Sequence, residues 1–111
     1  MLGSGAVMVM DDSRDMVETL QRLSYFYMHE SCGQCTPCRE GTGWLWRMVQ
    51  RIQNGQGRPE DLAKLDNVAE NIMGRTICAL GDAAAMPVRA MLKHFRHEFA
   101  AKIDAAVKAP A

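Results

Sequence analysis

The sequence predicts an all-α fold, a four-helix bundle preceded by a short strand-like segment. Apolar residues recur at helical spacing in four segments of the chain. Proline, glycine or N-cap residues separate these segments, so only short loops are needed between them. No internal repeat or low-complexity block is visible. A chain of 111 residues is therefore expected to form one small helical domain.

The first element expected is not a helix. Residues 5–10 form a short apolar run that could be a strand. Because a lone strand is not stable in water, this run is expected to pair with a sheet elsewhere. We therefore assign residues 1–12 to a linker or strand from an upstream domain, 13–104 to the helical domain and 105–111 to a frayed tail. Residues 3–5 do not form a dinucleotide-binding motif, since no third glycine follows at the required spacing.

The first two helices are predicted from their caps and apolar stripes. Residues 11–13 can cap a helix that runs to about Glu30. Pro37 suits the first turn of a second helix, which ends at residues 54–57. The two stripes consist of Met16, Val17, Leu20, Leu23 and Tyr27, and of Trp44, Leu45, Met48, Val49 and Ile52.

Two further helices follow by the same criteria. Pro59 can open the third helix, and Gly74 ends it. Asp82 can cap a single fourth helix, with Pro87 tolerated in about its first turn. Their stripes consist of Leu62, Leu65, Val68, Ala69 and Ile72, and of Val88, Met91, Leu92, Phe95, Phe99 and Ile103.

Composition and charge exclude several functional classes. The formal net charge is zero, so no general attraction to nucleic acid or to an anionic membrane is expected. No apolar run approaches the roughly 18 residues of a spanning helix, and no signal peptide is recognisable. The chain is therefore expected in a compartment where thiols stay reduced. No arrangement typical of a hydrolase nucleophile is present.

The four cysteines carry the main functional signal. Cys32, Cys35 and Cys38 follow a Cys-x2-Cys-x2-Cys spacing, and Cys78 lies far downstream. Disulfides would have to survive a reducing compartment, and structural zinc usually takes two separated Cys-x-x-Cys pairs. A [4Fe–4S] cluster suits the spacing better, because a tight loop can bind three irons and a remote cysteine the fourth. The spacing favours the cluster, while a zinc-bound helical interaction module without a redox role stays the alternative.

The surroundings of the cysteines are consistent with a bound anionic cluster. Gly33 and Gly41 would allow close backbone approach, and the start of the second helix can direct N–H groups at sulfur. Arg39 and Arg75 could offset negative charge or could simply be solvated. Cys78 lies in the loop between the third and fourth helices, so the cluster is expected at one end of the bundle.

Other candidate residues have simpler explanations. His29 precedes the cysteine loop, but four cysteines already suffice as ligands. His94 and His97 are a possible metal pair but lack a suitably spaced third ligand. Trp44 is expected in the core, and Trp46 is expected to face outward.

Two segments resemble those of a known family: ESCGQCTPCREGTGW (residues 30–44) and TICALGDAA (residues 76–84). With KHFRHEF (residues 93–99), they resemble the C-terminal domain of the NADH-binding flavoprotein subunit of respiratory complex I, of the 51 kDa or F-subunit type. Related NAD-linked hydrogenase and formate dehydrogenase subunits contain the same module. The resemblance covers nearly the whole chain and points to a bacterial NADH:quinone oxidoreductase.

The resemblance implies a site, partners and a location. The site is one [4Fe–4S] cluster ligated by Cys32, Cys35, Cys38 and Cys78. It takes single electrons from reduced FMN and passes them to further clusters of neighbouring subunits, and eventually to quinone. FMN and NAD bind only in the parent subunit's upstream domain, so this chain alone should not oxidise NADH. The expected location is peripheral, on the cytosolic side of the bacterial inner membrane, without membrane insertion.

Overall fold

The computed structural model describes residues 3 and 5–108, and its ordered elements are all helices. Five helices follow one another in this part of the chain: α1 (Met16–Glu30), α2 (Thr36–Gln53), α3 (Asp61–Ile72), α4 (Leu80–His94) and α5 (Arg96–Lys108). The all-α prediction is confirmed. None of the described helices is both long and apolar enough to span a bilayer.

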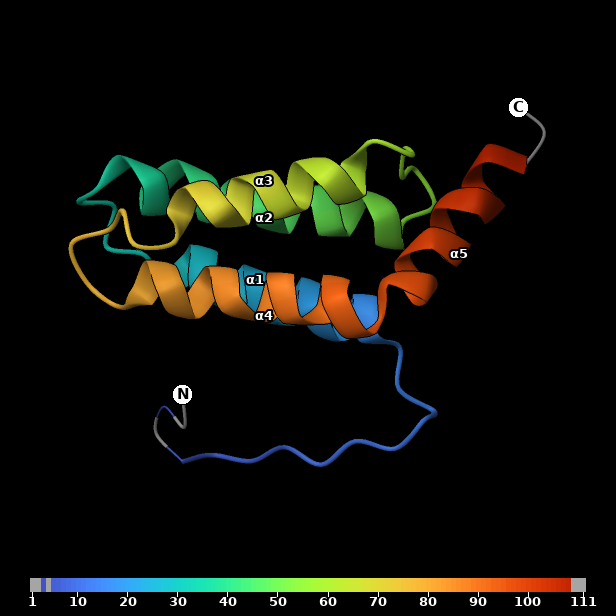
Figure 1. The fold of residues 1–111 in the computed structure, drawn as a ribbon, viewed down its shortest axis with the longest axis horizontal. Coiled ribbons are helices and arrows are strands. Elements are labelled where there is room, and N and C mark those ends of the chain that lie inside the picture. The colour runs from blue at the N-terminus through green and yellow to red at the C-terminus, as the bar shows by residue number, and fades with distance from the viewer. Residues whose placement is uncertain (1–2, 4, 109–111) are drawn as a thin grey trace.

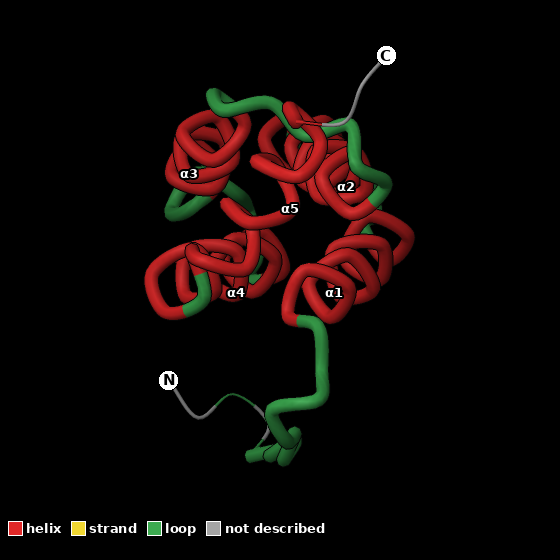
Figure 2. Tube along the Cα trace, turned by 90° about the vertical axis from the view of Figure 1, so that its right-hand side faces the viewer, coloured by secondary structure: helices red, strands yellow, loops and turns green. Residues whose placement is uncertain are grey.

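The first four helices lie side by side and α5 crosses one end of them (Figure 1). Viewed along the helices, α1, α2, α3 and α4 occupy four corners around a common core (Figure 2). The core contains aliphatic side chains from all five helices and one fully buried aromatic ring, that of Phe99 on α5. Burial of these side chains is the main force holding the bundle together. The core residues are Val17, Leu20, Leu45, Val49, Ile52, Leu62, Leu65, Ala69, Ile72, Ala85, Val88, Leu92, Phe99 and Ile103.

The start of α1 differs from the predicted one by a few residues. Asp15, rather than residues 11–13, is the N-cap: its carboxylate accepts hydrogen bonds from the backbone N–H groups of Val17 at 2.8 Å and Glu18 at 3.2 Å. Lys102 of α5 places its ammonium 2.6 Å from the same carboxylate. The backbone N–H of Met16 donates to Glu98 of α5 at 2.9 Å. The N-terminus of α1 is therefore capped partly by residues from the far end of the chain.

The predicted single fourth helix is wrong, because the chain bends at Phe95 and forms α4 and α5. The Phe95 N–H closes α4 on the Met91 carbonyl at 2.8 Å, while the Phe95 carbonyl accepts from Glu98 in the first turn of α5. Pro87 lies in the middle of α4 rather than in its first turn. Its missing N–H leaves one helical bond unmade there.

The strand expected at residues 5–10 is also not formed. This segment runs extended along the outside of the bundle, without a partner strand in the described part of the chain (Figure 1). Val7, Met8 and Val9 are at least 78% exposed. A strand needs a partner for its backbone groups, and no described segment supplies one. Residues 1, 2, 4 and 109–111, which belong to the predicted linker and tail, lie outside the described residues; residues 105–108 are helical.

Candidate metal centre

The four cysteines lie at one end of the bundle, on its two neighbouring connections. Cys32 lies in the α1–α2 connection, Cys35 is the N-cap of α2, and Cys38 lies in the first turn of that helix. Cys78 lies in the α3–α4 connection. Figure 1 shows both connections at the end of the bundle opposite α5. The fold thus brings the remote cysteine to the same end as the other three.

All four cysteines have free thiols, and their exposure differs. Cys38 is buried, Cys35 is half-buried, and Cys32 and Cys78 are exposed. The Cys38 sulfur lies 3.1 Å from the hydroxyl oxygen of Ser31. No disulfide joins any two of them.

The four sulfurs do not converge on one point in this structure. Among residues 3 and 5–108, no three His, Cys, Asp or Glu side chains are grouped closely enough to hold a metal ion. His29, His94 and His97 therefore join no such group either. The predicted ligand set of Cys32, Cys35, Cys38 and Cys78 stays a prediction that rests on spacing and on shared location.

The α1–α2 connection is held in shape by Arg39. Its guanidinium donates to the Gly33 carbonyl at 2.9 Å and to the Thr36 hydroxyl at 3.3 Å. Gly33 has a φ of +76°, a left-handed conformation that suits glycine, and its α-carbon faces the Arg39 side chain. These hydrogen bonds of Arg39 stabilise the loop that carries Cys32 and Cys35. The Arg39 guanidinium also forms an ion pair with Glu40 at 3.2 Å.

The α3–α4 connection has its own internal bonds. Asp82 on α4 accepts a hydrogen bond from the Gly74 N–H at 2.7 Å, across the loop. The Thr76 hydroxyl donates to the Cys78 carbonyl at 2.9 Å. Thr76 also packs against Gly81, where a β-carbon would overlap it. Asp82 thus closes the Cys78 loop instead of capping the helix as predicted, since the N-cap of α4 is Ala79.

Two supporting residues and the role of a third were not identified from the sequence. Ser31, Thr76 and the loop-closing role of Asp82 become visible only when the connections are folded. Their short polar side chains beside cysteines were the available signal, because such side chains often bond nearby backbone groups in loops.

The predictions for the two tryptophans are wrong. Trp44, expected in the core, is 52% exposed on the outside of α2. Trp46, expected to face outward, is half-buried against α1, with its ring 5.6 Å from that of Tyr25 in an edge-on arrangement. Nothing in this arrangement assigns either ring a role at the cysteines.

Residues 18–102 match the family described as the NADH-ubiquinone oxidoreductase-F iron-sulfur binding region. The chain belongs to this family. The resemblance seen in the cysteine segments is therefore confirmed.

Relatives of this iron–sulfur binding region are components of a larger enzyme. The F subunit of NADH-quinone oxidoreductase from Rickettsia massiliae is 55% identical over 102 residues, which are 92% of this chain and 24% of the relative. The Rickettsia bellii F subunit is 54% identical over 103 residues, or 93% and 25% of the two chains. The chain thus spans about a quarter of the length of these curated relatives.

Solved structures with the same fold include NAD+-reducing [NiFe]-hydrogenases. The H2-reduced form matches with a TM-score of 0.84 and 37% identity, over 89% of this chain and 17% of that one. The air-oxidized form matches with a TM-score of 0.81 and 33% identity, over 90% and 20%.

The electrostatics of the iron–sulfur binding region suit an anionic group at the cysteine end. Helices α2 and α4 begin at this end, directly after Cys35 and shortly after Cys78, and neither has a side-chain cap. Their first N–H groups are therefore available, and each helix N-terminus carries partial positive charge. A cluster held by four thiolates is negatively charged, so the donor set fits it in number, chemical type and electrostatic setting.

Proposed function

We propose that this chain holds a single [4Fe–4S] cluster through Cys32, Cys35, Cys38 and Cys78. The observation that supports it most is that the fold brings four free thiols to one end, beside two uncapped helix N-termini. The chain contains only four cysteines, so thiolates alone can ligate one such cluster and no more. Such a group, when bound, accepts and releases one electron at a time.

The proposed place of the chain is within an NADH:quinone oxidoreductase. The electron donor would be reduced FMN in the upstream part of the parent subunit, and the acceptors would be further iron–sulfur clusters of neighbouring subunits. Support comes from the F-subunit relatives, which this chain matches over about a quarter of their length. The proposed location is the cytosolic face of the bacterial inner membrane, as a peripheral component.

The protein's own residues would have two tasks at this site. Arg39 and Asp82 fix the backbone of the two connections, so that the thiols are presented at constant positions. Ser31 can donate its hydroxyl hydrogen to the Cys38 sulfur, 3.1 Å away, and so help to hold that sulfur in place. Hydrogen bonds to sulfur and burial of Cys38 would also tune the reduction potential.

The exposed segment at residues 5–10 is proposed to add to a sheet of the upstream domain. Its apolar side chains and unpaired backbone are both accessible in the described structure. A strand added to an existing sheet would satisfy both. Residues 13–104 would then form the helical domain proper.

The test is chemical analysis of protein purified without oxygen. About four irons and four sulfides per chain, with an electron paramagnetic resonance signal appearing on reduction, are expected for a redox cluster. One zinc and no sulfide would instead support the zinc-bound interaction module, which requires the same cysteines.

A matched pair of variants tests the remote ligand. Cys78→Ser should lose iron or convert the cluster, whereas Ile77→Ser, at the neighbouring and 78% exposed position, should leave it unchanged. An unaltered cluster in Cys78→Ser would remove Cys78 from the proposed ligand set.

A further inference from the structure

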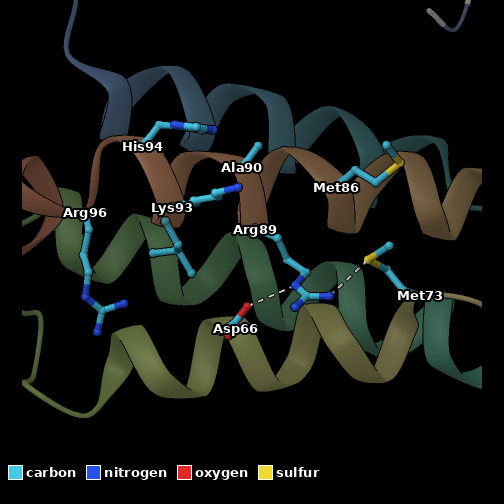
Figure 3. Close-up of a pocket in the computed structure, with 9 residues that line it drawn as sticks. Asp66, Met73, Met86, Arg89, Ala90, Lys93, His94 and Arg96 are labelled. Carbon is cyan, nitrogen blue, oxygen red and sulfur yellow. Dashed lines mark hydrogen bonds and ion pairs between the residues drawn. The ribbon is translucent and has the colours of Figure 1, made fainter. Parts of the chain in front are cut away.

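A groove of about 580 Å³ lies between α3 and α4, and Figure 3 draws the residues that line it. No role follows for it from the proposed cluster, because none of its lining residues is a cysteine. Its lining consists of Asp66, Met73, Met86, Arg89, Ala90, Leu92, Lys93, His94 and Arg96.

Positive charge is concentrated in the groove, although the protein as a whole carries no net charge. Arg89, Lys93 and Arg96 line it against one carboxylate, that of Asp66, while the formal net charge of the chain is zero. Asp66 is already paired with Arg89 at 3.2 Å. Lys93 and Arg96 form no ion pair within the described part of the chain, so both charges are available to a partner.

The groove also has an apolar and adaptable part. Met73, Met86 and Ala90 line it, and the Arg89 guanidinium lies 3.8 Å from the Met73 sulfur (Figure 3). Methionine side chains are flexible and polarizable, so they can fit different apolar groups. A ligand that used the whole groove would need both negative charge and apolar surface.

Helix-end electrostatics explain only part of this pattern. Lys93 lies in the last turn of α4, where a cation is favoured by the helix dipole. Arg96 is the first residue of α5, where the same effect disfavours a cation, and Arg89 lies more than a turn before the end of α4. The dipole also gives no reason for an apolar hollow beside these charges.

We propose that the α3–α4 groove binds an acidic segment of a partner protein. Carboxylates of the segment would pair with Lys93 and Arg96, and its apolar side chains would contact Met73 and Met86. A small inorganic anion would leave the two methionine side chains unused. Nucleic acid is not favoured, since none of the residues that line the groove is Phe, Tyr or Trp, on which bases could stack, and the lining contains a carboxylate. This inference goes beyond the proposed cluster and does not require it.

Zero-length cross-linking tests the proposal on the intact assembly that contains the chain. A carbodiimide joins a lysine to a carboxylate only when the two are in direct contact. Lys93 should be recovered in an amide bond to an Asp or Glu of another polypeptide, and should react slowly with an acetylating reagent. Lys64, exposed on α3 and outside the groove, is the internal control.

Three results would overturn the proposal. If Lys93 is acetylated as fast in the assembly as in the isolated chain, nothing covers the groove. Protection of Lys93 without a carboxylate cross-link would show that the covering surface is not acidic. Protection of Lys93 by inorganic phosphate in the isolated chain, again without a cross-link in the assembly, would assign the groove to a small anion.

A charge-reversal pair gives a second measurement. K93E/R96E should weaken association with the cross-linked partner about tenfold or more, with a reduced dependence on salt. R58E/K108E changes the net charge equally at exposed positions outside the groove and should have little effect. Equal effects of the two variants would refute a specific groove. Iron content, measured on the same preparations, tests the cluster separately.

Discussion

Gly41 of α2 lies so close to Ile72 of α3 that a β-carbon on Gly41 would come within 2.7 Å of two side-chain carbons of Ile72. Ile72 is buried in the core and has little room to move. Gly41 is also one turn beyond Cys38, so this contact sets how α2 passes α3 near the cysteine end. The absence of a side chain at this position is therefore a packing requirement.

Gly41→Ala should destabilise the protein by about 1–2 kcal/mol, because overpacking outweighs the gain in helix propensity. Gly43→Ala is the matched control on the same helix. Its nearest contact is the flexible end of Arg47, at 2.9 Å, so this variant should be neutral or up to about 1 kcal/mol more stable. Urea unfolding of both variants checks the prediction, and equal effects would contradict the close α2–α3 packing.

Asp61→Ala should destabilise the protein by about 2–4 kcal/mol. Asp61 is fully buried, and it accepts hydrogen bonds from the Arg51 guanidinium, one of them at 3.1 Å, and from the Arg58 N–H at 2.9 Å. Lys64→Gln, which breaks an exposed ion pair with Glu60, should cost no more than about 0.5 kcal/mol. Thermal unfolding should clearly distinguish the two variants. A small loss of stability in Asp61→Ala would mean that the pair of Asp61 and Arg51 contributes little to the stability of the fold.

Asp82→Ala should loosen the loop that carries Cys78. The variant loses the hydrogen bond from the Gly74 N–H and about 1 kcal/mol of stability. Hydrogen exchange at Gly74 should become faster, and the proposed cluster should be retained less well. Asp104→Ala, at an exposed position on α5, is the control. Unchanged exchange at Gly74 would show that the loop holds its shape without Asp82.

Asp15→Asn should reduce the acid sensitivity of the fold. Burial alone raises the pKa of Asp15, but hydrogen bonds from Lys102 and from the start of α1, together with the Lys102 charge, lower that pKa below its ordinary value. The stability that the ionised group contributes is therefore present above its unfolded-state pKa of about 3.9 and is lost as pH falls through the lower folded-state pKa. Because Asn still caps a helix, the variant isolates the charge.

Urea unfolding at a series of pH values measures this effect. At neutral pH Asp15→Asn should be less stable than the natural protein, and the difference should shrink below about pH 4. Asp12→Asn, at an exposed position, should not change the pH profile in this way. A constant difference between Asp15→Asn and the natural protein at all pH values would contradict the proposed role of the charge.

The sequence predicted the helical fold because each buried stripe repeats along one helix. It did not predict the bend at Phe95, since the apolar stripe continues from Val88 to Ile103 without a glycine or proline at the bend. There, α5 turns to contact the distant start of α1, through Glu98 and Lys102. Such contacts between remote segments leave no local pattern.

The candidate site, too, was predictable only in part. Cysteine spacing identified the residues, and the placement of Cys78 between two helices predicted its meeting with the others at one end. Trp44 was assigned to the buried stripe because it lies four residues before Met48, but this spacing did not predict its orientation. The centre of the buried face lies at Leu45, Val49 and Ile52, and Trp44 falls on its edge. The supporting bonds of Arg39 and Asp82 depend on loop conformations that a single sequence does not reveal.

The two ends of the bundle offer different opportunities for engineering. The α2–α3 connection lies at the end opposite the cysteines, and α2, with 18 residues, separates the two by about 27 Å (Figure 1). Gln56 in this connection is exposed, and Gly55 beside it has no atoms near the position of a β-carbon. A fluorescent amino acid introduced at Gln56 would add no thiol and would lie one helix length from the cysteines. Position 56 is therefore a suitable place for a label in distance measurements on a larger assembly.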